Sequence, residues 1–272
     1  MKTSYSAPPG GLPAQSTLMT GRAVFTEAYA VLPAGTMRDI TASRLPHWEG
    51  TKAWVLARPL SGFAETFSQY AMVLNADGGS ETPDSDPRAE SAIFVTQGGI
   101  RLTVGDTESD LRAGAFAYVP ADTRWSLRAS GEGAAFQWIR KRYQPAEGIA
   151  PPAAFIAHDH DVAPIAMPDT DGRWATTRFM DPDDMAHDMH VTIVTFEPGG
   201  VIPFEETHVM EHGLYVLEGK AVYKLNRDWV EVEAGDFMWL RAFCPQACYA
   251  GGPGRFRYLL YKDVNRHARL MP

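Results

Sequence analysis

The chain has 272 residues, of which 45% are hydrophobic and 21% charged, with a formal net charge of −8 and a pI near 5.5. This composition allows a packed core in one large domain or in two domains of moderate size. The acidic balance argues against nucleic acid and anionic membrane as partners, and no apolar run reaches transmembrane length. We also expect no signal peptide, and therefore a cytoplasmic protein.

The first part of the chain predicts an arm followed by strands. Residues 1–20 are rich in Pro, Gly and Ser and predict an arm without a core of its own. From Arg22 to Thr66, short apolar runs alternate with turn residues, which is typical of strands. No long amphipathic helix is evident anywhere, so we predict an all-β protein.

An internal repeat divides the chain into two halves. ESAIFVTQG begins at Glu90 and EHGLYVLEG at Glu211, 121 residues apart, and the same offset separates Gly114 in AGAFAYVP from Gly235 in AGDFMWLR. Each half has the size of a small closed barrel, which needs no helices. We therefore expect an arm (1–20), an N-terminal barrel (21–148) and a C-terminal barrel (149–272), joined by a Pro- and Ala-rich linker over 142–154.

A cluster of candidate metal ligands lies between Gly200 and Gly219 in the second half. Glu206 and His208 are two residues apart and would share one face of a strand, and His212 keeps the same parity. One carboxylate and two imidazoles suit a divalent metal of borderline hardness. The simpler alternative is a polar strand end with two ordinary histidines.

The spacing G-x5-E-x-H-x3-H-x6-G resembles the first cupin motif, G-x5-H-x-H-x3-E-x6-G, with Glu and His exchanged at the outer positions. The second cupin motif, G-x5-P-x-G-x2-H, resembles GDFMWLRAFCPQ, which starts at Gly235 and places Gln246 where the motif has its His. The resemblance implies a bicupin of two tandem jelly-roll barrels, with Glu206, His208, His212 and Gln246 as metal ligands.

The repeat provides an internal control for this ligand set. Subtracting the offset of 121 from the four ligand positions gives Ser85, Pro87, Ser91 and Trp125, none of which replaces a ligand well. We therefore expect a metal-free N-terminal barrel with a structural role, although a binding role for its own pocket stays open.

Other candidate ligands are less favoured. Cys244 and Cys248 flank Gln246, and a thiolate ligand is the alternative to two reduced, partly buried thiols. Two further pairs of histidines lie outside the motif and are not included as ligands: His158 and His160, and His187 and His190.

The strands that follow the motif carry candidate substrate contacts. Residues 221–236, AVYKLNRDWVEVEAGD, predict a hairpin that carries Tyr223. In the last strand, RFRYLLYKDV, Phe256, Tyr258, Leu260 and Lys262 share the face that Phe and Leu mark as interior. Because a buried ammonium is costly unless it is paired, Lys262 either reaches solvent at the strand end or meets an anionic substrate in the barrel mouth.

The chain resembles the (S)-ureidoglycine aminohydrolase family, most sharply over 200–266. The features that carry this resemblance are ETHVMEHG, the Tyr-bearing strand, Gln246 and YLLYKDVNR. The resemblance implies a bicupin hydrolase acting on C–N bonds in purine (allantoin) breakdown. Its implied function is the release of ammonia from (S)-ureidoglycine, giving (S)-ureidoglycolate. It also implies the following residue roles: Glu206, His208, His212 and Gln246 as Mn²⁺ ligands, Glu206, Tyr223, Tyr258 and Lys262 as substrate contacts, and Glu206, Tyr258 and Lys262 in catalysis.

Several points stay open from the sequence. Another divalent metal could replace Mn²⁺, and Glu206, Tyr258 or a metal-bound water could manage the proton. The alternatives to the aminohydrolase are another metal-dependent cupin enzyme on a small carboxylic acid, such as a dioxygenase or isomerase, and a non-catalytic metabolite-binding cupin. We expect a small-molecule substrate and, by analogy with other bicupins, a homo-oligomer.

Overall fold

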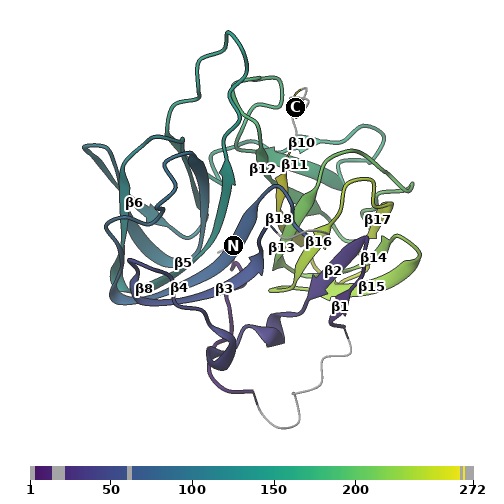
Figure 1. The fold of residues 1–272 in the computed structure, drawn as a ribbon. Helices are drawn as coiled ribbons and strands as arrows, with labels where there is room; N and C mark the ends of the chain where they lie inside the picture. Colours follow the sequence, from purple (N-terminus) through teal and green to yellow (C-terminus); the bar gives the residue numbers. More distant parts are fainter. Residues whose placement is uncertain (1–3, 14–21, 60–62, 264–265, 267–272) are drawn as a thin grey trace.

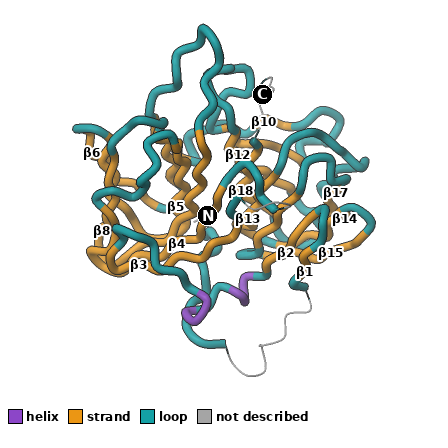
Figure 2. The backbone as a smooth tube through the Cα atoms, in the orientation of Figure 1, coloured by secondary structure: helices purple, strands orange, loops and turns teal. Residues whose placement is uncertain are grey.

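A computed structural model of the chain describes residues 4–13, 22–59, 63–263 and 266. Its regular structure is almost entirely β, and all paired strands are antiparallel, which confirms the predicted fold class (Figures 1 and 2). The helices of the described residues are two short 3₁₀ turns, η2 (Ala34–Thr36) and η3 (Asp39–Thr41). None of the helices in this part of the chain is long and apolar enough to cross a membrane.

The N-terminal half forms a seven-stranded sheet that is drawn in blue to teal in Figure 1. Its strands follow the order β3-β4-β8-β5-β7-β9, with β6 paired to β5. Their bounds are β3 (Glu49–Ala57), β4 (Ser68–Ser80), β5 (Ala89–Val104), β6 (Thr107–Arg112), β7 (Ala115–Val119), β8 (Trp125–Arg142) and β9 (Phe155–His158).

The C-terminal half is built from an eight-stranded and a three-stranded sheet. The larger sheet has the order β1 (Val24–Phe25), β2 (Tyr29–Leu32), β16 (Phe237–Leu240), β13 (His212–Glu218), β18 (Phe256–Lys262), β12 (His190–Phe196), β11 (Trp174–Arg178) and β10 (Ile165–Ala166). The smaller has the order β15 (Asp228–Glu233), β14 (Lys220–Leu225) and β17 (Gln246–Tyr249). The predicted hairpin is β14–β15, and Asn226 in its turn has a φ of 54°.

Each half lends a strand to the sheet of the other. Strand β2 precedes the expected boundary at 148/149 but pairs with β16 of the C-terminal half. Strand β9 follows the boundary but pairs with β7 of the N-terminal half. Figure 1 shows β1 and β2, in purple, lying against the yellow-green strands of the C-terminal half. The expected linker over 142–154 lies between β8 and β9 and contains no strand beyond the final residue of β8. The two barrels are therefore joined by backbone ladders as well as by the linker.

Three apolar cores fill this arrangement. One lies in the N-terminal barrel and includes Trp125, the residue at the position equivalent to Gln246. The second lies in the C-terminal barrel and includes Phe256, Tyr258 and Leu260, which confirms the predicted inner face of the last strand. The third lies between the barrels, where Phe67 from the first half stacks on Tyr261 from the second with ring centroids 4.0 Å apart.

Part of the N-terminal arm is fixed to the body of its own chain. Tyr5 is 7% exposed and donates a hydrogen bond to Asp159 Oδ2 at 2.7 Å, and Ser6 N donates to the Leu217 carbonyl. Both Asp159 oxygens also accept from Arg257, at 2.8 Å each, and both partners of this ion pair are buried. The pair links the start of the second half to its last strand.

We predict that Asp159→Ala lowers the unfolding free energy by about 3–5 kcal/mol, because it leaves the Arg257 guanidinium buried without its counter-charge. Urea unfolding followed by tryptophan fluorescence measures this loss. Asp161→Ala, at an exposed position two residues away, is the matched control and should unfold like the parent protein. Equal midpoints for the Asp159 variant and the parent would show that the buried pair contributes nothing to stability.

Candidate metal centre

Glu206 and Gln246 lie directly opposite one another although forty residues separate them in the chain. An isolated antiparallel bridge joins them, in which each backbone N–H donates to the carbonyl of the other at 3.0 Å. Directly opposed residues of an antiparallel pair project to the same side. The bridge therefore sets the Glu206 carboxylate and the Gln246 amide side by side.

The two imidazoles complete the set. Gln246 Nε2 is 3.2 Å from His208 Nε2 and 3.5 Å from His212 Nδ1, and Glu206 Oε2 is 4.0 Å from His208 Nε2. The two imidazole ring centroids are 4.6 Å apart. The structure thus brings together all four residues that the motif spacing predicts.

Burial sets the protonation of these groups. Burial lowers the pKa of His208. The His212 ring is more deeply buried, and its pKa falls well below 6.5. The positive charge of Lys262 lowers both pKa values further. Both rings are therefore neutral near pH 7, which is the form that binds metals. Burial raises the pKa of Glu206, and the Lys262 ammonium opposes that rise.

This donor set fits a divalent metal. His212 Nε2 is buried without a hydrogen-bond partner among the described residues, as expected of a nitrogen that faces an absent ion. No three His, Cys, Asp or Glu side chains in the described chain stand in a closed coordination cluster, and this includes Glu206, His208 and His212. The fourth donor, Gln246, is an amide whose nitrogen and oxygen exchange places by rotation of the last side-chain bond. One carboxylate, one amide and two imidazoles suit Mn²⁺ or Fe²⁺ as well as Zn²⁺.

Lys262 is the last residue of β18 and lies opposite His212 on one side and His190 on the other. It is only partly exposed, and burial lowers its pKa while the Glu206 carboxylate raises it. Of the two predicted positions for Lys262, the structure favours the cation at the metal centre, because Glu206 is the acidic group that acts on it.

Two tyrosines form the deeper wall of the barrel. Tyr223 and Tyr258 are 0% and 4% exposed, and their ring centroids are 6.2 Å apart at an angle of 66°. Burial raises the pKa of both phenols well above 10, so the hydroxyl groups stay protonated near pH 7 and can donate hydrogen bonds.

The structure also places the cysteines and histidines that the sequence analysis did not favour as metal ligands. Burial raises the pKa of Cys248 above its usual range and that of Cys244 to about 11, so without a metal both are neutral thiols near pH 7. His158 Nε2 lies 3.1 Å from the Ala113 carbonyl in the other half of the molecule. Burial lowers the pKa of His190 to about 4, so this ring is neutral beside Lys262.

Glu211 supports the centre from behind, and the motif reasoning missed it. It precedes His212 and is 4% exposed. Its carboxylate accepts hydrogen bonds from Glu65 N, Thr66 N, Thr66 Oγ1 and Trp239 Nε1 at 2.6–3.0 Å.

The residue after His212 is Gly213, and a Cβ at this position would lie 2.7 Å from the Phe67 ring. The internal repeat could have pointed to Glu211, because Glu90 occupies the equivalent position in the first half. The Glu90 carboxylate also accepts a hydrogen bond, from Tyr118 at 2.6 Å.

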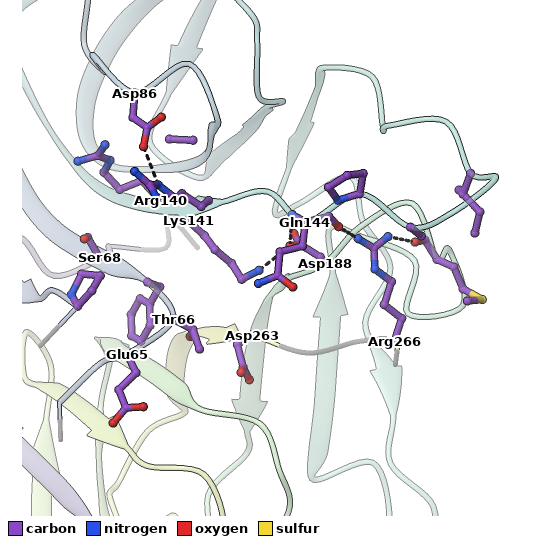
Figure 3. A pocket seen from close by; sticks show the side chains of 18 of the residues that line it. Glu65, Thr66, Ser68, Asp86, Arg140, Lys141, Gln144, Asp188, Asp263 and Arg266 are labelled. Atoms are coloured by element: carbon purple, nitrogen blue, oxygen red, sulfur yellow. Dashed lines mark hydrogen bonds and ion pairs between the residues drawn. The ribbon is translucent and has the colours of Figure 1, made fainter. Parts of the chain in front are cut away.

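A large cleft lies away from this centre. It has a volume of about 940 Å³ and lies between the barrels, where Lys141 and Asp188 form a buried ion pair at 2.5 Å (Figure 3). None of the predicted ligands or substrate contacts lines it.

Comparisons with known proteins identify the family of the chain. The family profile described as Cupin domain matches residues 71–139 and 192–261, one match in each half. An (S)-ureidoglycine aminohydrolase from Arabidopsis thaliana is 32% identical over 247 residues, covering 90% of this chain and 79% of that protein. One from Escherichia coli (strain K12) is 29% identical over 257 residues, covering 93% and 95%. A solved structure from Pseudomonas aeruginosa, of a protein named for induction by glyoxylate, is 62% identical, has a TM-score of 0.93 and covers 100% of both chains.

We predict that Glu206→Ala weakens Mn²⁺ binding by about a hundredfold or more, since loss of even an outer-shell partner commonly costs 10–100-fold. Titration of free Mn²⁺ by electron paramagnetic resonance measures the affinity. Glu205→Ala is the matched control, because this neighbouring carboxylate pairs with Lys224. Unchanged affinity in the Glu206 variant would remove this residue from the ligand set.

Proposed function

Because the chain belongs to the (S)-ureidoglycine aminohydrolase family of cupin proteins, we propose that it is a Mn²⁺-dependent enzyme that releases ammonia from (S)-ureidoglycine and yields (S)-ureidoglycolate. The observation that carries the proposal is the meeting of Glu206, His208, His212 and Gln246 with Lys262 at one end of the C-terminal barrel. The ligand set supplies a place for the metal, and the lysine supplies a charge for the substrate carboxylate.

The substrate has a carboxylate, an amine and a ureido group on one carbon. A divalent metal held by the four ligands would supply a template and a Lewis acid for such a molecule. Lys262 pairs with the carboxylate through a charge-assisted hydrogen bond, because Glu206 is needed at the metal and leaves the ammonium without an anion. The hydroxyl groups of Tyr223 and Tyr258 face the same interior and donate to the polar oxygens of the substrate.

The reaction exchanges an amine for a hydroxyl group. The C–N bond to the amine breaks, a C–O bond to water forms, and a proton from that water leaves with the amine as ammonia. Glu206, Tyr258 or a water activated by the metal would move this proton. Burial keeps the Tyr258 phenol protonated near pH 7, so its hydroxyl group can donate to the substrate.

The proposal predicts that the Mn²⁺-loaded protein accelerates ammonia release from (S)-ureidoglycine formed in place from allantoate, and that EDTA abolishes the acceleration. Lys262→Met should lower kcat/KM by about a hundredfold while metal content is retained, because the charged hydrogen bond to the carboxylate is lost. Lys220→Met, at an exposed position on β14, is the control and should leave kcat/KM unchanged.

A folded, metal-loaded protein that leaves the spontaneous rate unchanged would contradict the proposed activity. Full activity in the Lys262 variant would instead contradict only the role of that residue. The expected cytoplasmic location and homo-oligomer stay predictions.

A further inference from the structure

Arg178 is the last residue of β11, and the strand register places it on the inner face of the C-terminal barrel. One row across the neighbouring strands β11, β12, β18 and β13 consists of Arg178, Thr192, Leu260 and Leu214, each directly opposite the next. Leu260 and Leu214 belong to the interior core of this barrel. Because directly opposed residues share a face, Arg178 belongs to the interior row next to the one that holds His190, Lys262 and His212.

The side-chain contact of Arg178 agrees with this placement. Its Nε donates to Thr176 Oγ1 at 3.1 Å, and Thr176 lies opposite Val194, another residue of the interior core. Arg178 is only partly exposed. Its charge acts on Lys262 and on His190 and lowers the pKa of both, so the guanidinium is within electrostatic reach of the metal centre.

Arg178 lacks a counter-charge of its own. Within the described part of the chain, it forms no ion pair with a carboxylate. By contrast, Arg257, a buried arginine of the same sheet, is paired with Asp159. Glu206 is the carboxylate that acts on Lys262, and metal binding would occupy it. Two cations would then face the barrel interior beside a divalent metal, and a bound anion would balance them.

We infer that Arg178 is a specificity-determining residue that binds the substrate carboxylate together with Lys262. The inference rests on the proposed function and narrows its substrate class to small molecules in which a carboxylate adjoins the metal-binding amine or hydroxyl group. The guanidinium presents two parallel N–H donors that match the two carboxylate oxygens, whereas the Lys262 ammonium acts as a point charge. A neutral amide in place of the carboxylate would meet two unbalanced cations and be rejected.

The test uses stable probes with the Mn²⁺-loaded, full-length protein. Hydantoate (N-carbamoylglycine) has the carboxylate and the ureido group of the proposed substrate but no reactive amine, and its carboxamide is the neutral match. Isothermal titration should show Arg178→Met weakening hydantoate binding by about tenfold or more, with Arg178→Lys recovering part of the loss and metal content unchanged. Weak binding of the carboxamide should be unaffected. Arg173→Met, at the exposed turn just before β11, is the matched control and should bind hydantoate like the parent protein.

Glycolate, a carboxylate without a ureido group, separates this inference from the proposed function. If the Mn²⁺-loaded parent protein leaves the rate of ammonia release from (S)-ureidoglycine unchanged, and Arg178→Met weakens glycolate binding, the carboxylate role stands and the ureido substrate is wrong. If ureidoglycine turnover is normal and Arg178→Met leaves hydantoate binding and KM unchanged, the role of Arg178 is wrong and the function stands. If the parent protein binds glycolate and hydantoate no better than the carboxamide, the carboxylate role of Arg178 is wrong, and the turnover assay tests the function separately.

Discussion

The carboxylate of Glu211 joins the two barrels directly behind the proposed metal site, and the geometry of that site depends on it. Glu65 and Thr66 of the first half donate to this carboxylate, and the next residue in the chain, His212, carries a proposed metal-binding imidazole. A buried carboxylate that receives several hydrogen bonds is held in a single position. The ligand strand β13 is therefore fixed from outside its own barrel.

The same contact exists in duplicate, as the internal repeat requires. Glu90 is the counterpart of Glu211, and Tyr118, which donates to it, is the counterpart of Trp239. Burial raises the pKa of Glu90, and the nearby Asp188 raises it further. Both halves have thus kept the interface, but only the second half has the ligand residues. This division explains why a barrel with Ser85, Pro87, Ser91 and Trp125 at the ligand positions remains part of the protein: it supports the strands that carry the site.

Much of the fold and of the centre could be predicted because both depend on local spacing. The alternation along the last strand placed Lys262 on the interior face, and the two cupin-like motifs together indicated four side chains that do meet. The exchange of β2 and β9 between the sheets, the support of Glu211 by Thr66 and the position of Arg178 could not be found in this way. Each depends on which distant strands pair, and a local pattern does not determine long-range partners. Arg178 in particular lies two strands away from Lys262, and nothing in its own segment distinguishes it from a surface arginine.

The central claim is that one barrel holds a metal and its sister does not. Anomalous diffraction from crystals of the Mn²⁺-loaded protein, recorded on both sides of the manganese absorption edge, tests it most directly. The account predicts one manganese peak per chain, bounded by Glu206, His208, His212 and Gln246, and none inside the N-terminal barrel. A peak bounded by other residues, or a second peak near Ser91 and Trp125, would contradict it.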